Sequence, residues 1–291
     1  VGRFRGGLGY AAILASMIFA GLPGSPVADA AALGGIMIPL MVKNGYSKER
    51  STGLLCSGAV IAPIIPPSIP MIVLATGTGL SVSKMFMAGL VPGIILGIFL
   101  MICWRIIVVR DKVDDTVHFT KEQIKHILKD SLPALFMPIL IIGGIRFGIF
   151  TPTEAGAFAV VYALVISLFV YREMKLRDLA DVFLEGAKST GIVMFIVAAA
   201  SAVGWLITVA QIPAKVVTLL EPLIAHPLAL LLMINLFLFI MGMIMDLTPN
   251  ILIFGPILVP VVEAAGIDPI VFGVIMVLNL TIGLITPPVG T

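Results

Sequence analysis

Apolar runs alternate with short charged segments along the 291 residues of the chain, a pattern typical of a helical membrane protein. A helix needs about 20 apolar residues to span the ~30 Å hydrocarbon core of a bilayer. Four uninterrupted runs meet this length and predict spanning helices: Met85–Val109, Ser131–Ile149, Glu154–Tyr171 and Thr190–Val209.

Two charged segments flank the second and third of these helices. Asp111–Asp130 and Arg172–Lys188 mix charged and apolar residues at helical spacing, which is typical of amphipathic segments in the membrane interface. Short loops rich in Lys and Arg stay in the cytoplasm, whereas the loop Phe150–Thr153 has no basic residue. We therefore expect both charged segments on the cytoplasmic side and Phe150–Thr153 on the outside.

The start of the third helix carries a capping signal. Thr151 and Glu154 have the spacing of a capping box, and Pro152 occupies the first helical position. Capping is therefore the favoured role of Glu154. A proton or ion site is the alternative, because ionisable residues in membrane helices often serve transport.

Two further apolar segments, Leu8–Met41 and Leu228–Val262, are interrupted in the middle. Their halves of roughly 14–17 residues fall below the usual spanning length. Non-helical backbone at membrane depth is tolerated only inside protein or along a cavity, so each segment predicts a re-entrant hairpin. The breaks in the hairpins and in the helices that follow them are Gly21–Pro26, Gly242 with Asp246–Asn250, Ile65–Ser68 and Thr286–Gly290.

Glycines and prolines of the two hairpin regions recur at a constant offset of 221 positions, without a gap over about 47 residues. This register predicts an internal repeat. The pairs are Gly21 and Gly242, Gly34 and Gly255, Pro39 and Pro260, Gly45 and Gly266, Pro66 and Pro287, and Pro67 and Pro288.

Basic residues predict opposite orientations for the two copies. Lys43, Lys48 and Arg50 follow the first hairpin, whereas the equivalent loop around Gly266 has none, so the repeats are expected to be inverted. The register also predicts a fragment that lacks both ends, with about 90 residues before it and about 40 after it in a parent of about 420.

Composition excludes several classes of protein. Hydrophobic residues make up 59% and charged residues 12%, against roughly 45–50% and 25% in soluble domains. Cys56 and Cys103 lie in apolar runs and form neither a disulfide framework nor a metal site. The sequence has no zinc-binding His/Glu spacing, no Gly-x-Ser-x-Gly motif and no P-loop, so it predicts neither an enzyme nor an ATP-driven pump.

The helix breaks are the candidate binding site. Half-helix N-termini attract anions, and unwound carbonyls with side-chain oxygens coordinate Na⁺. Two clusters are expected to bind cations, with a substrate anion between them. The first cluster is Gly24, Ser25 and Asp29 opposite Pro66 and Ser68, and the second is Gly242, Asp246, Thr248 and Asn250 opposite Thr286, Pro287 and Gly290.

Structural alternatives exist for several of these residues. Ser25 has the position of a helix cap, and Asp29 that of a residue complementing the helix dipole. Function is favoured for Asp29 and Asp246, because an unpaired carboxylate inside a membrane is costly. An intramembrane aspartyl protease using these two residues, and a channel, are rival hypotheses; inverted hairpins favour alternating access. Asn235 and Asn279 are expected to form hydrogen bonds between helices.

An ordered set of motifs over essentially the whole chain resembles the large membrane (M) subunit, the DctM-like family, of TRAP (tripartite ATP-independent periplasmic) transporters. Family members commonly have Ser where Pro26 stands, which argues against a side-chain ligand there. The motifs are Gly24–Ala31, Gly45-Tyr46, Ile64–Ile69, Ala88–Gly93, Thr151–Ala155 and Thr286–Gly290.

This resemblance implies an all-α elevator fold like that of the ion transporter superfamily, with Na⁺ as the coupling ion. It implies Na⁺-driven import of an organic acid across the bacterial inner membrane. A periplasmic substrate-binding (P) protein would deliver the substrate, and a small membrane (Q) subunit would brace the scaffold. A carboxylate symporter that works without a binding protein is the alternative.

The resemblance also divides the chain. Residues 1–110 and 216–291 would form the transport domain, 111–130 a cytoplasmic arm, and 131–215 the scaffold with a second arm at 172–188. Na⁺ is expected at Ser25 and Ser68 in one cluster, and at Thr248 and Thr286 in the other.

Overall fold

The computed structural model describes residues 5–20, 24–111 and 121–288, with the backbone alone for residues 111 and 121–128. These residues form helices joined by short turns, and no strand occurs among them. The predicted all-α membrane architecture is confirmed, because six helices are long and apolar enough to cross a bilayer. They are Pro26–Lys43, Val82–Arg110, Pro152–Val170, Leu176–Val209, Pro227–Ile244 and Leu247–Ala264.

The first hairpin region comprises five helices. The helices α1 (Gly7–Phe19) and α2 (Pro26–Lys43) lie against each other, and α3 (Lys48–Ala59) packs on both. A tight turn at Gly45, with φ of +90°, reverses the chain between α2 and α3. After the predicted break come α4 (Ile69–Thr78) and the long α5 (Val82–Asp111), which packs along α1.

The second hairpin region repeats this packing. The helices α11 (Pro227–Ile244) and α12 (Leu247–Ala264) lie against each other, and α13 (Pro269–Leu284) packs on both. Both ends of α12 lie 221 residues after the ends of α2, and α13 begins 221 residues after α3. Gly266 takes a positive φ like Gly45, and the Pro66–Pro67 and Pro287–Pro288 bonds are both cis.

The helix breaks fall within or next to the predicted segments, with Gly242 and Leu247–Asn250 inside α11 and α12, and three of the four hairpin halves are longer than expected. Three of the four halves, α2, α11 and α12, have 18 residues and α1 has 13. The value of 18 lies within the ~17–25 residues of spanning helices, so length alone does not distinguish these halves from full spans. The structure shows that α1 packs on α2 and α11 on α12, as the predicted hairpins require.

Helices α4 and α5 of the first hairpin region share a hydrophobic core with α11–α13, whereas α1–α3 pack with α5 in a separate cluster. Helix α4 packs on α12, and α13 packs on α5. Leu74, Phe86, Val261 and Phe272 are all at most 2% exposed in this core. Burial of side chains from both regions holds them together as one body, since each large apolar side chain contributes about 1.5–3 kcal/mol when buried.

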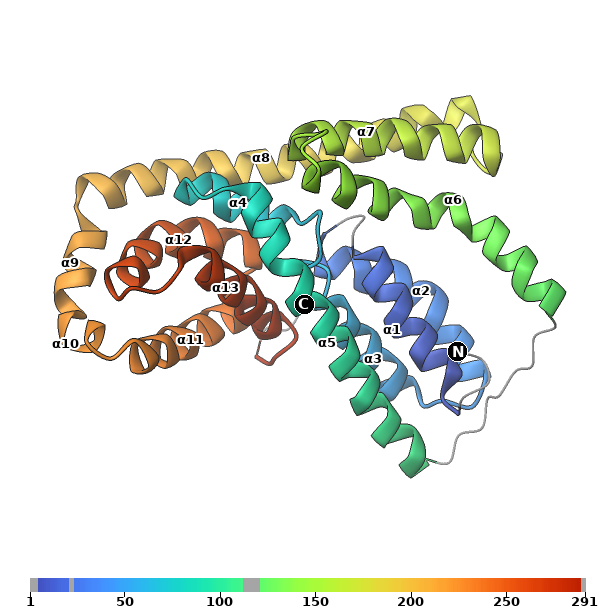
Figure 1. Cartoon of the computed structure of the whole chain (residues 1–291), viewed down its shortest axis with the longest axis horizontal. Coiled ribbons are helices and arrows are strands. Elements are labelled where there is room, and N and C mark those ends of the chain that lie inside the picture. Colours follow the sequence, from blue (N-terminus) through green and yellow to red (C-terminus); the bar gives the residue numbers. More distant parts are fainter. Residues whose placement is uncertain (1–4, 21–23, 112–120, 289–291) are drawn as a thin grey trace.

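The remaining helices run around the outside of this body (Figure 1). Helices α8, α9 and α10 pass around α11–α13, and both α8 and α9 pack on α12. Helix α6 pairs with α7, which continues into a π-helical turn, η1. The bounds are α6 Lys121–Arg146, α7 Pro152–Val165, η1 Ile166–Val170, the 3-10 turn η2 Leu176–Asp178, α8 Leu179–Val209, α9 Ile212–Leu219 and α10 Glu221–Ile224.

The local predictions for these outer helices are confirmed in part. The capping box at the start of α7 is present, with the Thr151 hydroxyl accepting from the Glu154 amide and the Glu154 carboxylate from the Thr151 amide. The charged segments do not form separate helices. Residues 121–130 continue into the rest of α6 without a break, and α8 runs from Leu179 through the predicted span; residues 112–120 lie outside the described part.

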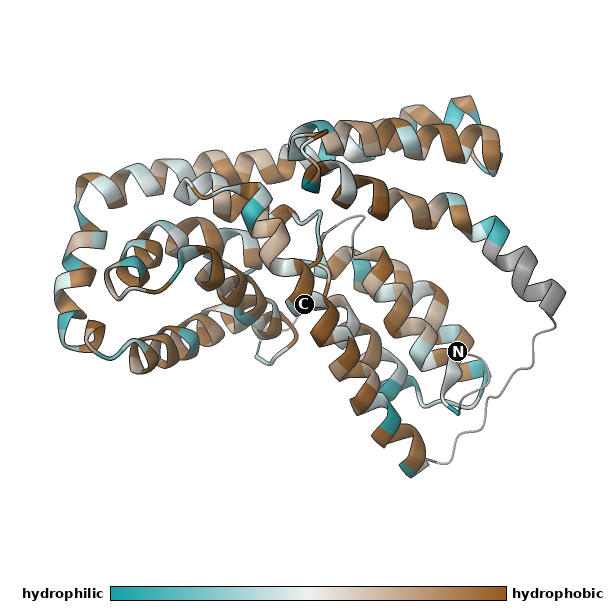
Figure 2. Ribbon diagram, viewed as in Figure 1, coloured by the Kyte–Doolittle hydropathy of each residue, from teal (hydrophilic) through white to brown (hydrophobic). Residues whose placement is uncertain are grey.

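Hydrophobic residues predominate along most of the helices (Figure 2), and many of them are exposed. Phe169, beyond α7, and Phe195, on α8, are 70% and 77% exposed, and neighbouring residues of α7 and α8 are similar. Apolar surface on this scale marks contact with lipid or another protein. It is consistent with a multi-pass membrane protein.

Candidate functional site at the helix breaks

The first hairpin meets the first helix break at Gly24. Its φ is +57°, and a side chain there would lie 2.9 Å from the Pro67 carbonyl oxygen and 3.1 Å from the Ser68 Cα. Contacts under 3.0 Å are not compatible with a Cβ atom, so only glycine allows this approach. The predicted opposition of the tip and the Pro66–Ser68 break is present, although Gly21–Pro23 lie outside the described residues.

Two serines begin the half-helices that converge here. The Ser25 hydroxyl accepts from the Ala28 amide at 3.4 Å and caps α2. The buried Ser68 hydroxyl accepts from the Met71 amide at 3.2 Å, caps α4 and donates to the Pro63 carbonyl. No hydrogen bond joins Ser25 to Ser68. Both serines therefore act as caps, and two half-helix N-termini with their partial positive charge lie close together.

Asp29 lies one turn into α2 and is 1% exposed. Neither carboxylate oxygen has a hydrogen-bond partner among the described residues. The N-terminal end of α2 stabilises a negative charge by only about 0.3–1 kcal/mol, up to ~2 where partly buried. Desolvating a carboxylate costs several kcal/mol, so the dipole alone does not compensate for the burial of this side chain.

The second hairpin meets the second helix break at two glycines. A side chain at Gly242 would lie 2.8 Å from the Leu280 carbonyl oxygen, and one at Gly283 would lie 2.7 Å from the Gly242 backbone. The end of α11 therefore crosses the end of α13 with direct backbone contact. Thr286 lies three residues after Gly283 in the chain, and its hydroxyl donates to the Ile282 carbonyl at 2.8 Å. The predicted opposition of Gly242 and the Thr286 break is present here too.

Asn250 closes the second tip. Its amide donates to the carbonyls of Met241 at 3.2 Å and Met245 at 3.0 Å, which ties α12 to the end of α11. Asn250 is fully buried, and its side-chain oxygen has no partner among the described residues. Asn250 stands 221 residues after Asp29, so the two hairpins place a buried, unpartnered side-chain oxygen at the same point.

The position of the Asp246 side chain differs from the prediction. We expected a carboxylate held inside protein, but Asp246 is exposed and makes no capping hydrogen bond to α12. Thr248 is half-buried in the first turn of α12, and no hydrogen bond joins it to Thr286. The buried polar group at this tip is therefore Asn250, which donates to the carbonyls of Met241 and Met245 at the end of α11.

A small pocket of about 80 Å³ lies beside the tips: Pro26 and Ile285 in its lining adjoin Ser25 and Thr286 in the chain, but no residue of the two predicted clusters lines it. Side chains from the start of α2, the end of α3 and the end of α13 line it: Pro26, Val27, Ala30, Cys56, Ala59, Leu284 and Ile285. This volume is below the roughly 300–1,000 Å³ of pockets that hold small ligands. A substrate in this place therefore requires the tips to move apart.

Further predicted residues are placed as follows. The Asn279 amide donates to the Asn235 side-chain oxygen at 2.6 Å, so the predicted hydrogen bond between α13 and α11 is confirmed. Pro66 is buried, Pro287 is exposed, and Gly290 lies outside the described residues.

Sequence reasoning did not single out Gly283. The signal for it was weak, because its repeat counterpart is Ala62 and not glycine.

Comparison with known proteins agrees with this geometry. Apolar spans around paired helix breaks define a membrane transport protein rather than an enzyme. The whole chain, residues 1–291, matches the family described as "Tripartite ATP-independent periplasmic transporter, DctM component". The chain belongs to this family.

Three relatives illustrate the similarity. The chain is 49% identical over 290 residues to the 2,3-diketo-L-gulonate TRAP transporter large permease protein YiaN of Escherichia coli. It is 43% identical to the C4-dicarboxylate TRAP transporter large permease protein DctM of Pseudomonas aeruginosa; each match covers the whole chain and 68% of the relative. The isethionate TRAP transporter permease protein DctMQ of Oleidesulfovibrio alaskensis is 37% identical, and the chain covers 46% of it.

These relatives decide between the hypotheses drawn from the sequence. They are named transporter permeases, so the chain is a transport protein and not an enzyme. The aspartyl protease hypothesis is therefore wrong. The sequence-based assignment to the large subunit of TRAP transporters is confirmed.

Proposed function

We propose that the protein is the membrane part of a Na⁺-driven importer of organic acids that works by an elevator movement. The observation that carries the proposal is the pair of buried, unpartnered oxygens at Asp29 and Asn250. They occupy repeat-related positions next to the two helix breaks. A desolvated oxygen without a partner is costly, and a bound cation offsets that cost.

Na⁺ is the cation that best fits the donor set. Its ligands would be oxygens, and both tips offer hydroxyl, carbonyl and amide or carboxylate oxygens with little nitrogen or sulfur. In the first cluster we assign Na⁺ to the surroundings of Ser25, Ser68 and Asp29. In the second we assign it to Gly242, Thr248, Asn250 and Thr286.

The substrate would be an organic anion bound between the clusters. The N-termini of α2 and α4 lie close together at the first tip, and helix N-termini attract anions. The relatives are named for 2,3-diketo-L-gulonate, C4-dicarboxylates and isethionate, which are all small organic acids. Na⁺ bound at the tips would order them around the substrate and close the pocket.

The repeat supports an elevator movement. Helices α4 and α5 share a core with α11–α13, α1–α3 pack with α5 in a second cluster, and the offset of 221 residues supports two inverted copies of one unit. This body would slide against a scaffold that includes α6, α7 and most of α8. The family's name describes a tripartite assembly, so we propose a small membrane subunit, fused in the DctMQ relative, and a periplasmic binding protein as partners in a bacterial inner membrane.

Uptake by proteoliposomes tests this function. The full-length permease would be reconstituted with its small subunit and supplied with its cognate binding protein and labelled substrate. We expect accumulation with an inward Na⁺ gradient, and none with a K⁺ gradient of equal size. Equal uptake under both gradients would contradict Na⁺ coupling, and uptake without the binding protein would favour a two-component or simpler symporter.

A further inference from the structure

Helix α6 packs on the body formed by α1–α5 and α11–α13 over only part of its length. Ile141 and Ile145, toward its end, are 2% and 8% exposed and belong to the core that α4, α5 and α11–α13 share. Around Ser131, an open groove of about 520 Å³ separates α6 from α1 and α2. Its walls include Ala15, Ile18 and Leu33 on the body, and Ser131, Ala134 and Tyr171 on the other side.

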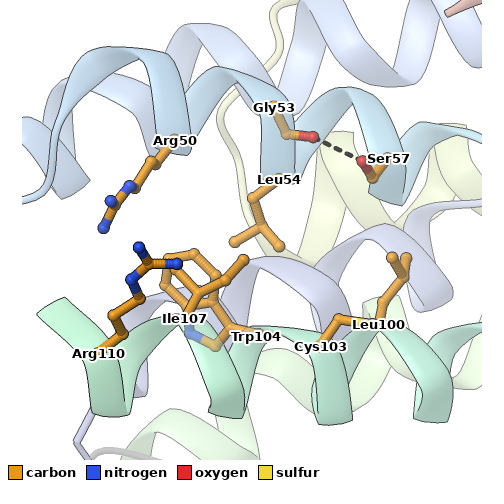
Figure 3. Close-up of a pocket in the computed structure, with 9 residues that line it drawn as sticks. All are labelled: Arg50, Gly53, Leu54, Ser57, Leu100, Cys103, Trp104, Ile107 and Arg110. Carbon is orange, nitrogen blue, oxygen red and sulfur yellow. Dashed lines mark hydrogen bonds between the residues drawn. The ribbon is translucent and has the colours of Figure 1, made fainter.

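Helix α1, on the body's side of the groove, is fixed to α5. Trp104, which forms part of the wall between α3 and α5 (Figure 3), donates from its indole N–H to the Gly6 carbonyl at 3.0 Å. A side chain at Gly9 would overlap Trp104, and one at Gly97 would overlap Met17, so both glycines allow a close approach of α1 and α5. Contacts with α5 therefore hold α1 in place independently of α6.

Two tyrosines hold the other side of the groove, where α6 lies on α7. The Tyr162 hydroxyl donates to the Pro133 carbonyl at 2.7 Å, and the Tyr171 hydroxyl donates to the Asp130 carbonyl at 2.6 Å. Phe136 packs near the Tyr162 ring, with the ring centroids 6.4 Å apart. Both acceptors lie in the stretch of α6 that lines the groove, so the two hydroxyls fasten to α7 the part of α6 that does not pack on the body.

The π-helical turn η1 directs Tyr171 toward α6. Tyr171 follows Tyr162 by nine residues, which is about two and a half turns of an α-helix and would place the two side chains on opposite sides of α7. The Tyr171 amide instead donates to the Ile166 carbonyl, five residues before it, as in a π-turn. A single π-turn accommodates one extra residue, so Tyr171 takes the direction of an eighth residue, about 80° from Tyr162.

We propose that Tyr162 and Tyr171 are positioning residues that hold α6 on α7 and away from α1 and α2, so that the body can move past α6. This inference rests on the elevator movement proposed above. Ala15 and Ala134 lie on opposite sides of the groove, and small residues favour close packing of helices in a membrane. Without the two hydroxyls, α6 would be free to close on α1 and would obstruct the movement.

Distances between spin labels test the positioning of α6 directly. Leu132 on α6 and Ile36 on α2 are 64% and 71% exposed, and neither lines the groove, so each can carry a label. The labelled, cysteine-free full-length permease would be measured with its small subunit at one Na⁺ concentration. Tyr162→Phe combined with Tyr171→Phe should broaden the distance distribution and shift it to shorter values. An unchanged distribution would overturn the proposal.

Uptake rates show whether the position of α6 matters for transport. The double variant should lose roughly fivefold in maximal rate, the effect expected from one hydrogen bond of ordinary strength. The half-saturating concentrations of Na⁺ and substrate should change by less than about twofold, because neither tyrosine lies at the helix breaks. An unchanged maximal rate, or an equal fall in unfolding temperature and rate through loss of fold, would overturn the proposal. Failure of the proposed function is recognised separately, as wild-type uptake that does not depend on Na⁺.

Deletion of Ser167 is the matched control for the π-turn. It removes the extra residue and leaves Tyr171 eight residues after Tyr162 in a regular α-helix, with the same side-chain direction. The label distance and the maximal uptake rate should therefore stay at their wild-type values. A deletion variant that resembled the double tyrosine variant would contradict the role given to the π-turn.

Discussion

The helices that follow the two hairpin tips, α2 and α12, have equivalent bounds, but the chemistry of the tips differs. At the first, Ser25 caps α2 and the buried Asp29 carboxylate has no partner. At the second, Asp246 is exposed and caps nothing, and the buried Asn250 amide ties α12 to α11. The first tip therefore carries a buried carboxylate without a partner, whose charge a cation would compensate under the proposed function, whereas the second is closed partly by its own hydrogen bonds.

This difference indicates that the two tips depend on a bound ion to different degrees. A repeat duplicates backbone geometry, but each copy then acquires its own buried side chains. The second tip can keep its shape without an ion, because two hydrogen bonds hold it. The first tip should depend more strongly on Na⁺, since a carboxylate without a counter-ion opposes closure.

The largest effect is expected from Asn250→Asp, which makes the second tip resemble the first. The variant loses the two hydrogen bonds that the amide donates to the Met241 and Met245 carbonyls, and it buries a carboxylate. Without Na⁺ its free energy of unfolding should therefore fall by about 2–4 kcal/mol. Thermal unfolding in NaCl and in choline chloride would measure this. A variant as stable as wild type in choline chloride would contradict the role given to the amide.

Asp29→Asn makes the opposite change and should abolish most Na⁺-driven uptake. Losing a charge-assisted contact of about 1.5–3 kcal/mol corresponds to a roughly 10- to 100-fold drop. Glu263→Gln, at the exposed far end of α12, is the matched control and should transport normally. Initial uptake rates in proteoliposomes measure both, and equal rates for Asp29→Asn and wild type would remove Asp29 from the site.

Gly283→Ala tests the backbone crossing that is particular to the second tip. The new Cβ would lie 2.7 Å from the Gly242 backbone, so α11 and α13 must separate at a cost of about 1–3 kcal/mol. Gly204→Ala on α8 meets no atom within 4 Å and should be neutral or stabilising by up to about 1 kcal/mol. Unfolding temperatures compare the two, and equal effects would show that the crossing tolerates a side chain.

The smallest effect is expected at the caps. Ser25→Ala should destabilise the protein by about 1 kcal/mol, because the Ala28 amide loses its acceptor. Asp246→Ala should stay within about 0.5 kcal/mol, because Asp246 makes no capping hydrogen bond. Chemical denaturation measures the difference, and a larger loss at Asp246 would reverse the comparison of the tips.

Local signals made much of this fold predictable from sequence. Short motifs predict the helix breaks and the capping box at Thr151. Single polar residues within apolar runs predict the hydrogen bond between Asn279 and Asn235. The spacing also placed Gly24 opposite Pro66–Ser68. These features depend on residues close together in the chain and on the apolar environment of the membrane. Both can be inferred from the sequence.

Features that depend on tertiary packing could not be predicted. Asp246 and Asn250 look equally polar in sequence, and only the packing of α12 against the end of α11 shows that Asn250 is the buried one. Gly283 is one glycine among many until the backbone of Gly242 lies against it. The charged segment before Ser131 resembles a separate arm, but helix continuity through Asp130 makes it part of α6.

Equilibrium binding of radioactive Na⁺ to the purified permease and its Asp29→Asn variant tests the central claim most directly. The account predicts saturable binding to wild type, with the variant losing at least roughly tenfold in affinity at one site. Asp29→Asn should also be the more stable protein in the absence of Na⁺, because it no longer buries an unpartnered carboxylate. Identical Na⁺ binding by the two proteins would contradict the account.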